Sequence, residues 1–253
     1  ECANTFPFPG WNEGLNTAGP LAWLISTAFR ELPTKTDHRF DIIPVDDVAR
    51  GLATISAAAL EGTAGGVFHL ASSDVNPLRF GRTVELTGLA MRRWTRKGNG
   101  TGLDRTLLRY LDPVPVEKPG FLSVDRLKQW ADDATDYLQT KPQRSGWLQS
   151  LAGDALDRAR SRTSDQLRDT SKQLGRIEGM LELYKPFIEE HDYVFLTDRI
   201  RALQSPGPFE ADVKGLDWRH YWVDVEYPGL RTWCLPVMHG EKPPRDAASV
   251  PPL

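Results

Sequence analysis

The sequence has few of the features that mark several large classes of protein. It contains only two cysteines, Cys2 and Cys234, so we expect a reducing compartment and no framework of structural disulfides. The formal net charge is −3, whereas a nucleic-acid-binding surface needs a strong basic excess. The longest apolar run, residues 21–25, is far shorter than the ~20 residues that cross a membrane. These absences predict a protein that binds no nucleic acid and has no transmembrane span.

The chain also lacks an initiator methionine and opens with Glu1 and Cys2, followed at once by a loop rich in proline and glycine. Such an opening is typical of a chain that starts within a domain. Pro9 and Gly10 predict a shaped turn, because proline fixes φ and glycine permits conformations that other residues avoid. At the other end, residues 240–253 contain four prolines without periodicity, as in a tail or a linker.

Between these ends, short apolar segments alternate with helical patterns. Residues 40–45 and 67–71 are apolar enough for buried strands, and residues 48–60 and 80–92 have the pattern of helices. A shorter helix is predicted at residues 20–29, since proline is accepted at a helix start. This alternation of strands and helices predicts an α/β fold.

The composition changes after the helix predicted at residues 80–92. A basic, glycine-rich stretch at residues 92–102 is followed by a proline-rich loop at residues 112–120, and the predicted domain boundary lies near residue 115. Helical periodicity follows at residues 124–138 and 151–184. The predicted divisions are residues 1–115 as an α/β domain, residues 116–239 as a mainly helical domain, and residues 240–253 as a tail or linker.

Two separated groups of motifs resemble one family. The first group is residues 6–16 (FPFPGWNEGLN), 41–48 (DIIPVDDV) and 67–78 (VFHLASSDVNPL). The second is residues 183–187 (LYKPF), 193–195 (YVF), 209, 216–221 (LDWRHY) and 228–231 (PGLR). In order and spacing these motifs resemble the alcohol-forming fatty acyl-CoA reductases, which are extended short-chain dehydrogenases/reductases with a C-terminal helical "sterile" domain. The first group resembles the later part of the reductase domain, and the second resembles the sterile domain.

The resemblance implies a fold and a reaction. The fold is the C-terminal part of a Rossmann-like domain followed by a mainly α-helical domain. The reaction is NADPH-dependent reduction of a long-chain acyl-CoA to an aldehyde or alcohol. The family's glycine-rich cofactor loop and its Tyr-x-x-x-Lys dyad are expected before residue 1. No residue of this chain is therefore assigned a catalytic role, and the chain alone is expected to be inactive.

The resemblance also places the start of the chain at the active site. The residues that would border the nicotinamide are Glu1, Cys2, Pro9 and Gly10. Trp11 and Asn16 would line the site of the acyl group or thioester. The alternative for Trp11 is that its indole only packs beneath the turn, because large aromatic side chains serve cores and pockets alike.

Two motifs that suggest cofactor chemistry have simpler interpretations. Tyr137 and Lys141 have the spacing of the dyad, but Pro142 biases Lys141 out of a helix, and the match lies beyond the predicted boundary. The end of a helix is the preferred interpretation. Glycines at residues 98–102 lack the preceding strand that a dinucleotide loop needs, so we expect a surface loop there, beside a solvated basic face at residues 92–97.

Individual polar residues are likewise expected to be structural. Asp46 and Asp47 are predicted to cap the helix at residues 48–60 rather than to bind a metal. His69 lies in an apolar segment and is predicted to be a core histidine, and no histidine has the spacing of a metal ligand. The segment around Asp217 and Tyr221 is expected to serve packing and hydrogen bonding.

The leading hypothesis is that the chain supplies the substrate-binding lobe and helical cap of a reductase that acts on long-chain acyl-CoA. A cytoplasmic location is expected, with peripheral attachment to membranes left open. The alternative is a non-catalytic acyl-binding or scaffold module, with other lipid-metabolism domains fused downstream. A thioester reductase domain of the carboxylic acid reductase kind is a third interpretation, which the motifs at residues 183–231 disfavour.

Overall fold

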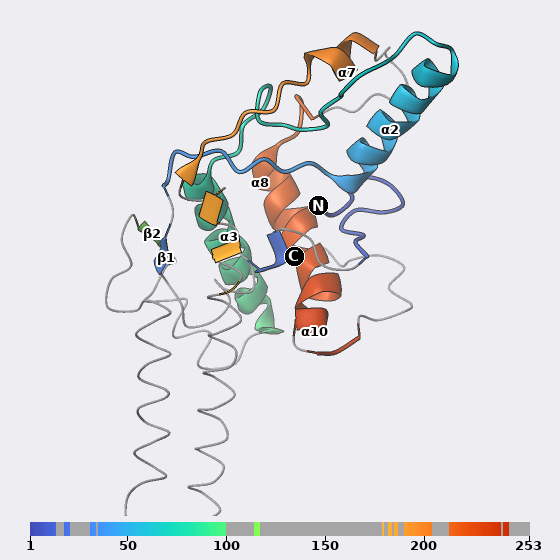
Figure 1. The fold of residues 1–253 in the computed structure, drawn as a ribbon. Coiled ribbons are helices and arrows are strands. Elements are labelled where there is room, and N and C mark those ends of the chain that lie inside the picture. The colour runs from blue at the N-terminus through green and yellow to red at the C-terminus, as the bar shows by residue number, and fades with distance from the viewer. Residues whose placement is uncertain are drawn as a thin grey trace, which may run out of the picture. The chain divides into compact units, whose positions relative to one another are not determined.

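The computed structural model divides the chain into two units: residues 1–118 with 185–253, and residues 119–184. The described residues are 1–13, 18–20, 31–33, 35–99, 114–116, 179, 182–183, 185–186, 190–203, 213–238 and 240–242. They belong almost entirely to the first unit (Figure 1). That unit groups residues 185–239 with the N-terminal segment, an arrangement that a domain boundary near residue 115 does not anticipate. Asn16, Tyr137 and Lys141 lie outside the described residues, as do most of the helices predicted at residues 20–29, 124–138 and 151–184.

The two helices that the sequence predicts most clearly are present. Helix α2 covers Val45–Leu60 and α3 covers Phe80–Trp94. The inner face of α3 is buried, while Arg82 and Glu85 form an ion pair on its exposed face, as expected of an amphipathic helix. A π-helical turn at Thr95–Asn99 extends α3, so the predicted surface loop does not begin at residue 98.

The segments predicted as strands are not regular strands, and in this respect the sequence-based assignment is wrong. The described strands are β1 (Glu31–Pro33) and β2 (Val114–Val116), which pair in parallel. In residues 40–45, Phe40 N donates to Leu78 O (2.8 Å) and Val45 N donates to Glu1 O (3.1 Å). These backbone groups bond to irregular chain, so the apolar segment is buried without extending a ladder. The α/β class stays a prediction.

The C-terminal helix, defined here as residues 218–238, is built from α-helical and π-helical turns. Its parts are α8 (Trp218–His220), a π turn (Tyr221–Glu226), α9 (Tyr227–Gly229), a second π turn (Leu230–Cys234) and α10 (Leu235–Met238). Pro228 and Pro236 lie inside it. Proline has no N–H to donate, which removes the regular hydrogen bond at these positions and accounts for the wider turns.

The core of the described residues lies where the C-terminal helix packs on α3 (Figure 1). Trp222 is fully buried and its Nε1 donates to Thr87 Oγ1 at 2.9 Å. Phe40 stacks on Phe80 with 4.6 Å between ring centroids. The fully buried side chains of Tyr221, Trp222 and Tyr227 make this helix a central element of the unit.

A second layer of contacts joins α2 to α7 (Asp198–Leu203). Asp74 accepts hydrogen bonds from Thr197 N (2.8 Å) and Thr197 Oγ1 (2.9 Å), which holds the start of α7. His69 lies beside this segment and is exposed, with its ring 5.6 Å from that of Phe195. The prediction of a core histidine is therefore wrong, because the segment at residues 67–69 runs along the surface. No helix in the described part of the chain has the length and apolarity that a membrane span requires.

Candidate functional site

The first residues of the chain lie directly against the C-terminal helix. Cys2 N donates to Glu226 Oε2 at 2.9 Å. Tyr221 Oη donates to the same carboxylate oxygen at 2.8 Å, and it also lies 2.7 Å from Cys2 O. All three residues are buried. A buried acid with two donors on one oxygen is a specific connection between segments more than 200 residues apart, since a missing partner would leave a buried polar group unsatisfied.

The electrostatics of this junction follow from its burial. Burial, with the nearby Glu1 carboxyl, raises the pKa of Glu226 to about 7. Burial also raises the pKa of the Tyr221 hydroxyl and the pKa of the Cys2 thiol well above their usual values. A thiol with a raised pKa is a poor nucleophile, because the thiolate is the reactive form. The junction therefore holds protons near neutral pH and does not activate Cys2.

The turn that follows is fixed by backbone bonds and by close packing. Ala3 N donates to Trp11 O and Gly10 N donates to Ala3 O, both at 2.8 Å. Gly10 has a φ of 82°, which favours glycine. A Cβ on Gly229 would lie 2.5 Å from Gly10 O and 2.6 Å from Cys2 Sγ. The C-terminal helix can approach the turn only because residue 229 has no side chain.

Asp46 holds the outer part of the loop. Its carboxylate accepts from Asn4 N (2.9 Å), Thr5 N (2.8 Å), Thr5 Oγ1 (2.7 Å) and Phe6 N (3.2 Å). Burial opposes its ionisation, but these hydrogen bonds outweigh burial and lower the pKa of Asp46. The predicted capping role is wrong: Pro44 is the N-cap of α2, and no side chain caps it. Asp46 lies one residue inside the helix, so its carboxylate reaches the loop instead of the free amides.

The structure brings together most of the residues that the resemblance assigned to the site. Cys2 and Gly10 are buried, Glu1 and Trp11 are half-buried, and Pro9 is exposed. Pro9 and Trp11 therefore still have accessible surface that a ligand could contact. Cys2 and Gly10 have little, so they are better suited to positioning the loop than to contacting a nicotinamide directly. Asn16 lies outside the described residues.

Sequence reasoning missed Glu226, which the structure places at the centre of the junction. A signal was available in the segment at residues 221–230, because two acids, Asp224 and Glu226, stand among aromatic and apolar residues there. Charged residues in such surroundings are seldom buried without a partner. The expectation that Asp217 and Tyr221 serve hydrogen bonding is confirmed, since Asp217 accepts from Arg219 N (2.8 Å) and His220 N (3.2 Å) as the N-cap of α8.

Comparison with known proteins gives relatives of one kind. Fatty acyl-CoA reductase 1 of Arabidopsis thaliana is 25% identical over 241 residues, which covers 90% of this chain and 45% of that protein. Probable fatty acyl-CoA reductase 5 of the same plant is 24% identical over 254 residues, with the same coverage. Fatty acyl-CoA reductase 2, chloroplastic, is 25% identical over 247 residues, which is 36% of its length.

No family profile matches the chain, and no solved structure is significantly similar to it. The chain spans about half the length, or less, of the curated relatives it matches. The resemblance is thus confirmed: over nine-tenths of its length, this chain is similar to curated proteins named fatty acyl-CoA reductases.

Proposed function

We propose that the chain is the C-terminal portion of an NADPH-dependent fatty acyl-CoA reductase and forms the substrate-binding lobe and helical cap of that enzyme. The observation that carries the proposal is the junction of Cys2, Tyr221 and Glu226. It joins the residues just before the first group of motifs to Tyr221 of the second group, and these groups resemble separate regions of the family, the reductase domain and the sterile domain. The relatives named fatty acyl-CoA reductases support the reaction class.

In this proposal the residues of the chain position a substrate and perform no chemical step. Asp46 and Gly10 shape the loop at residues 4–11, and Phe6 is 72% exposed on it. With half-buried Trp11, this loop offers an apolar border for an acyl group. NADPH, when bound, would supply a hydride to the thioester carbonyl. Sites of this kind combine an apolar lining with a few fixed polar groups.

The test is reduction of hexadecanoyl-CoA by the protein encoded by the complete open reading frame, followed by NADPH absorbance and by chromatography of the lipid products. We expect NADPH oxidation that depends on acyl-CoA and yields fatty aldehyde or alcohol. Trp11→Ala should raise KM for acyl-CoA several-fold more than it changes KM for NADPH. If the intact protein binds acyl-CoA but neither binds nor oxidises NADPH, the proposal is wrong, and the result favours a non-catalytic acyl-binding module.

A further inference from the structure

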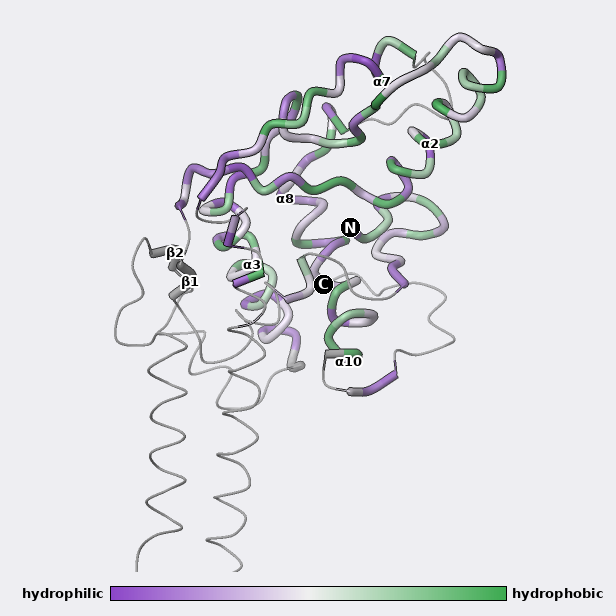
Figure 2. Tube along the Cα trace, viewed as in Figure 1, coloured by the Kyte–Doolittle hydropathy of each residue, from purple (hydrophilic) through white to green (hydrophobic). Residues whose placement is uncertain are grey.

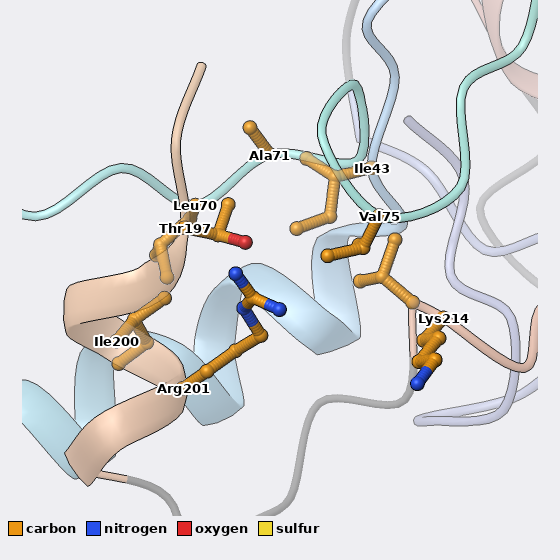
Figure 3. Close-up of a pocket in the computed structure, with 9 residues that line it drawn as sticks. Ile43, Leu70, Ala71, Val75, Thr197, Ile200, Arg201 and Lys214 are labelled. Atoms are coloured by element: carbon orange, nitrogen blue, oxygen red, sulfur yellow. The ribbon is translucent and has the colours of Figure 1, made fainter. Parts of the chain in front are cut away.

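A cavity with an empty volume of about 380 Å³, open solvent included, lies between α7, residues 70–75 and the chain just before α2 (Figure 3). None of the described residues that were assigned to the reductase site lines it. Its lining is mostly apolar, with Thr197, Arg201 and Lys214 as the polar members and Ile43, Leu70, Ala71, Val75, Ile200 and Val213 as the apolar ones. Within that space, water-sized groups can centre over about 50 Å³, which is several times the roughly 10–15 Å³ that one water needs and leaves room for a short chain only.

Arg201 gives the cavity its polarity. Figure 3 shows its guanidinium directed into the space between Thr197 and Ile43, while the ammonium of Lys214 points away from the centre. Within the described residues, the ion pair of Arg201 is with Asp74 Oδ2 at 3.5 Å, a distance too long for a strong hydrogen bond.

Asp74 is already engaged by another partner. Both of its carboxylate oxygens accept hydrogen bonds from Thr197, at 2.8 to 2.9 Å. Asp74 therefore lowers the local positive charge without occupying the donors of the guanidinium. Arg201 has five N–H donors in a planar fork that suits two oxygens of one anion, and a single long contact leaves most of that fork available.

We propose that this cavity binds a small amphipathic anion, with a short alkyl chain against the apolar lining and a carboxylate or phosphate head on Arg201. Charge complementarity favours an anionic head group over a neutral one, because a guanidinium beside apolar surface binds an anion more strongly than it binds an alcohol. The small volume selects a short chain. The proposal does not depend on the reductase activity, since it requires only the residues around the cavity.

The test is isothermal titration of the 253-residue chain with octanoate, octyl phosphate and 1-octanol. We expect at least one of the two anions to bind more tightly than the alcohol, and their ranking will distinguish a carboxylate head from a phosphate head. Arg201→Gln should weaken binding of the anion about tenfold, the effect of losing one charge-assisted hydrogen bond, and leave binding of 1-octanol unchanged. Val75→Phe should weaken all three ligands by filling the cavity.

Arg82→Gln is the matched control. Arg82 is 52% exposed and paired with a carboxylate, as Arg201 is at 50%, but it does not line the cavity. Methyl NMR of the unmodified chain keeps the test valid if a variant unfolds: octanoate or octyl phosphate should shift Ile43, Val75 and Ile200, and not the exposed Leu60. Equal binding of anions and alcohol, no binding of either anion, or shifts confined to other methyls would overturn the proposal.

Discussion

At the scale of single residues, Glu226 links the two ends of the chain and makes stability depend on pH. Its folded-state pKa of about 7 lies above that of an exposed glutamate, so the folded state binds the proton more tightly. The contribution of Glu226 to the free energy of unfolding is then fully present below about pH 4.5. It falls by on the order of 3 kcal/mol as pH rises to about 7. Glu226→Gln removes the ionisation and should flatten this dependence, as measured by urea unfolding between pH 4.5 and 8.

The control for this prediction is Glu85→Gln, on the exposed face of α3, which should keep the pH dependence of the unaltered chain. The glutamine that replaces Glu226 can still accept from Cys2 N and Tyr221 Oη through its amide oxygen, so the substitution tests charge more than shape. If Glu226→Gln keeps the same loss of stability between pH 4.5 and 7, another group is responsible.

Asp46 is another acid with a fixed structural task, and its pKa shift has the opposite sign. Its lowered pKa means that its stabilising effect is present above about pH 4 and is lost as pH falls through the folded value. Asp46→Asn removes the charge and turns an N–H group toward a backbone donor, so we expect a loss of about 2 kcal/mol at pH 7. Urea unfolding measures it, with exposed Asp37→Asn as the control. A loss equal to that of the control would show that the loop does not need the carboxylate.

At the scale of elements, Gly229 and Gly51 are both helical glycines that an added methyl group would crowd, but against different neighbours. At Gly229 the Cβ meets Gly10 O and Cys2 Sγ, which belong to the fixed turn, whereas at Gly51 it meets the end of the Leu70 side chain. We expect Gly229→Ala to lower the free energy of unfolding by about 1–2 kcal/mol, because the overpacking destabilises more than the higher helix propensity of alanine stabilises. Gly51→Ala should be near neutral because Leu70 can move. Thermal unfolding that ranks the two equally would contradict this account.

The elements also show what sequence patterns can predict. Helix α3 was predictable because the period of its buried residues is local information, and α2 because its alanine-rich composition, which favours a helix, is also local. The segments at residues 40–45 and 67–71 are apolar, but a strand exists only when another segment supplies its hydrogen bonds, and no local pattern identifies that partner. The π turns of the C-terminal helix follow from Pro228 and Pro236, which a reading limited to apolar periodicity overlooks.

At the scale of the whole molecule, the candidate site depends on contacts between distant parts of the sequence. The resemblance assigned Glu1, Cys2, Pro9, Gly10, Trp11 and Asn16 to the site. The structure places the first five in one loop, and Asn16 lies outside the described residues. The contribution of Glu226 and Gly229 was not predictable, because a buried acid and a close backbone approach are identified only when the two segments are seen in contact. The same holds for Asp46: its position at the start of α2 suggested a cap, and only the structure shows which groups donate to its carboxylate.

Contacts across the molecule should also set the order in which its helices open. The C-terminal helix and α3 share a buried interface through Trp222 and Thr87, so their amides should exchange with solvent at one slow rate. The outer turns of α2 are apolar (Figure 2) but exposed, with Leu60 at 91%, and should exchange at least tenfold faster, because local opening there breaks few buried contacts.

Hydrogen exchange followed by NMR measures all three helices. Thr87→Val should speed exchange equally in α3 and the C-terminal helix without affecting the outer turns of α2, and an effect confined to α3 would mean that the two helices open separately.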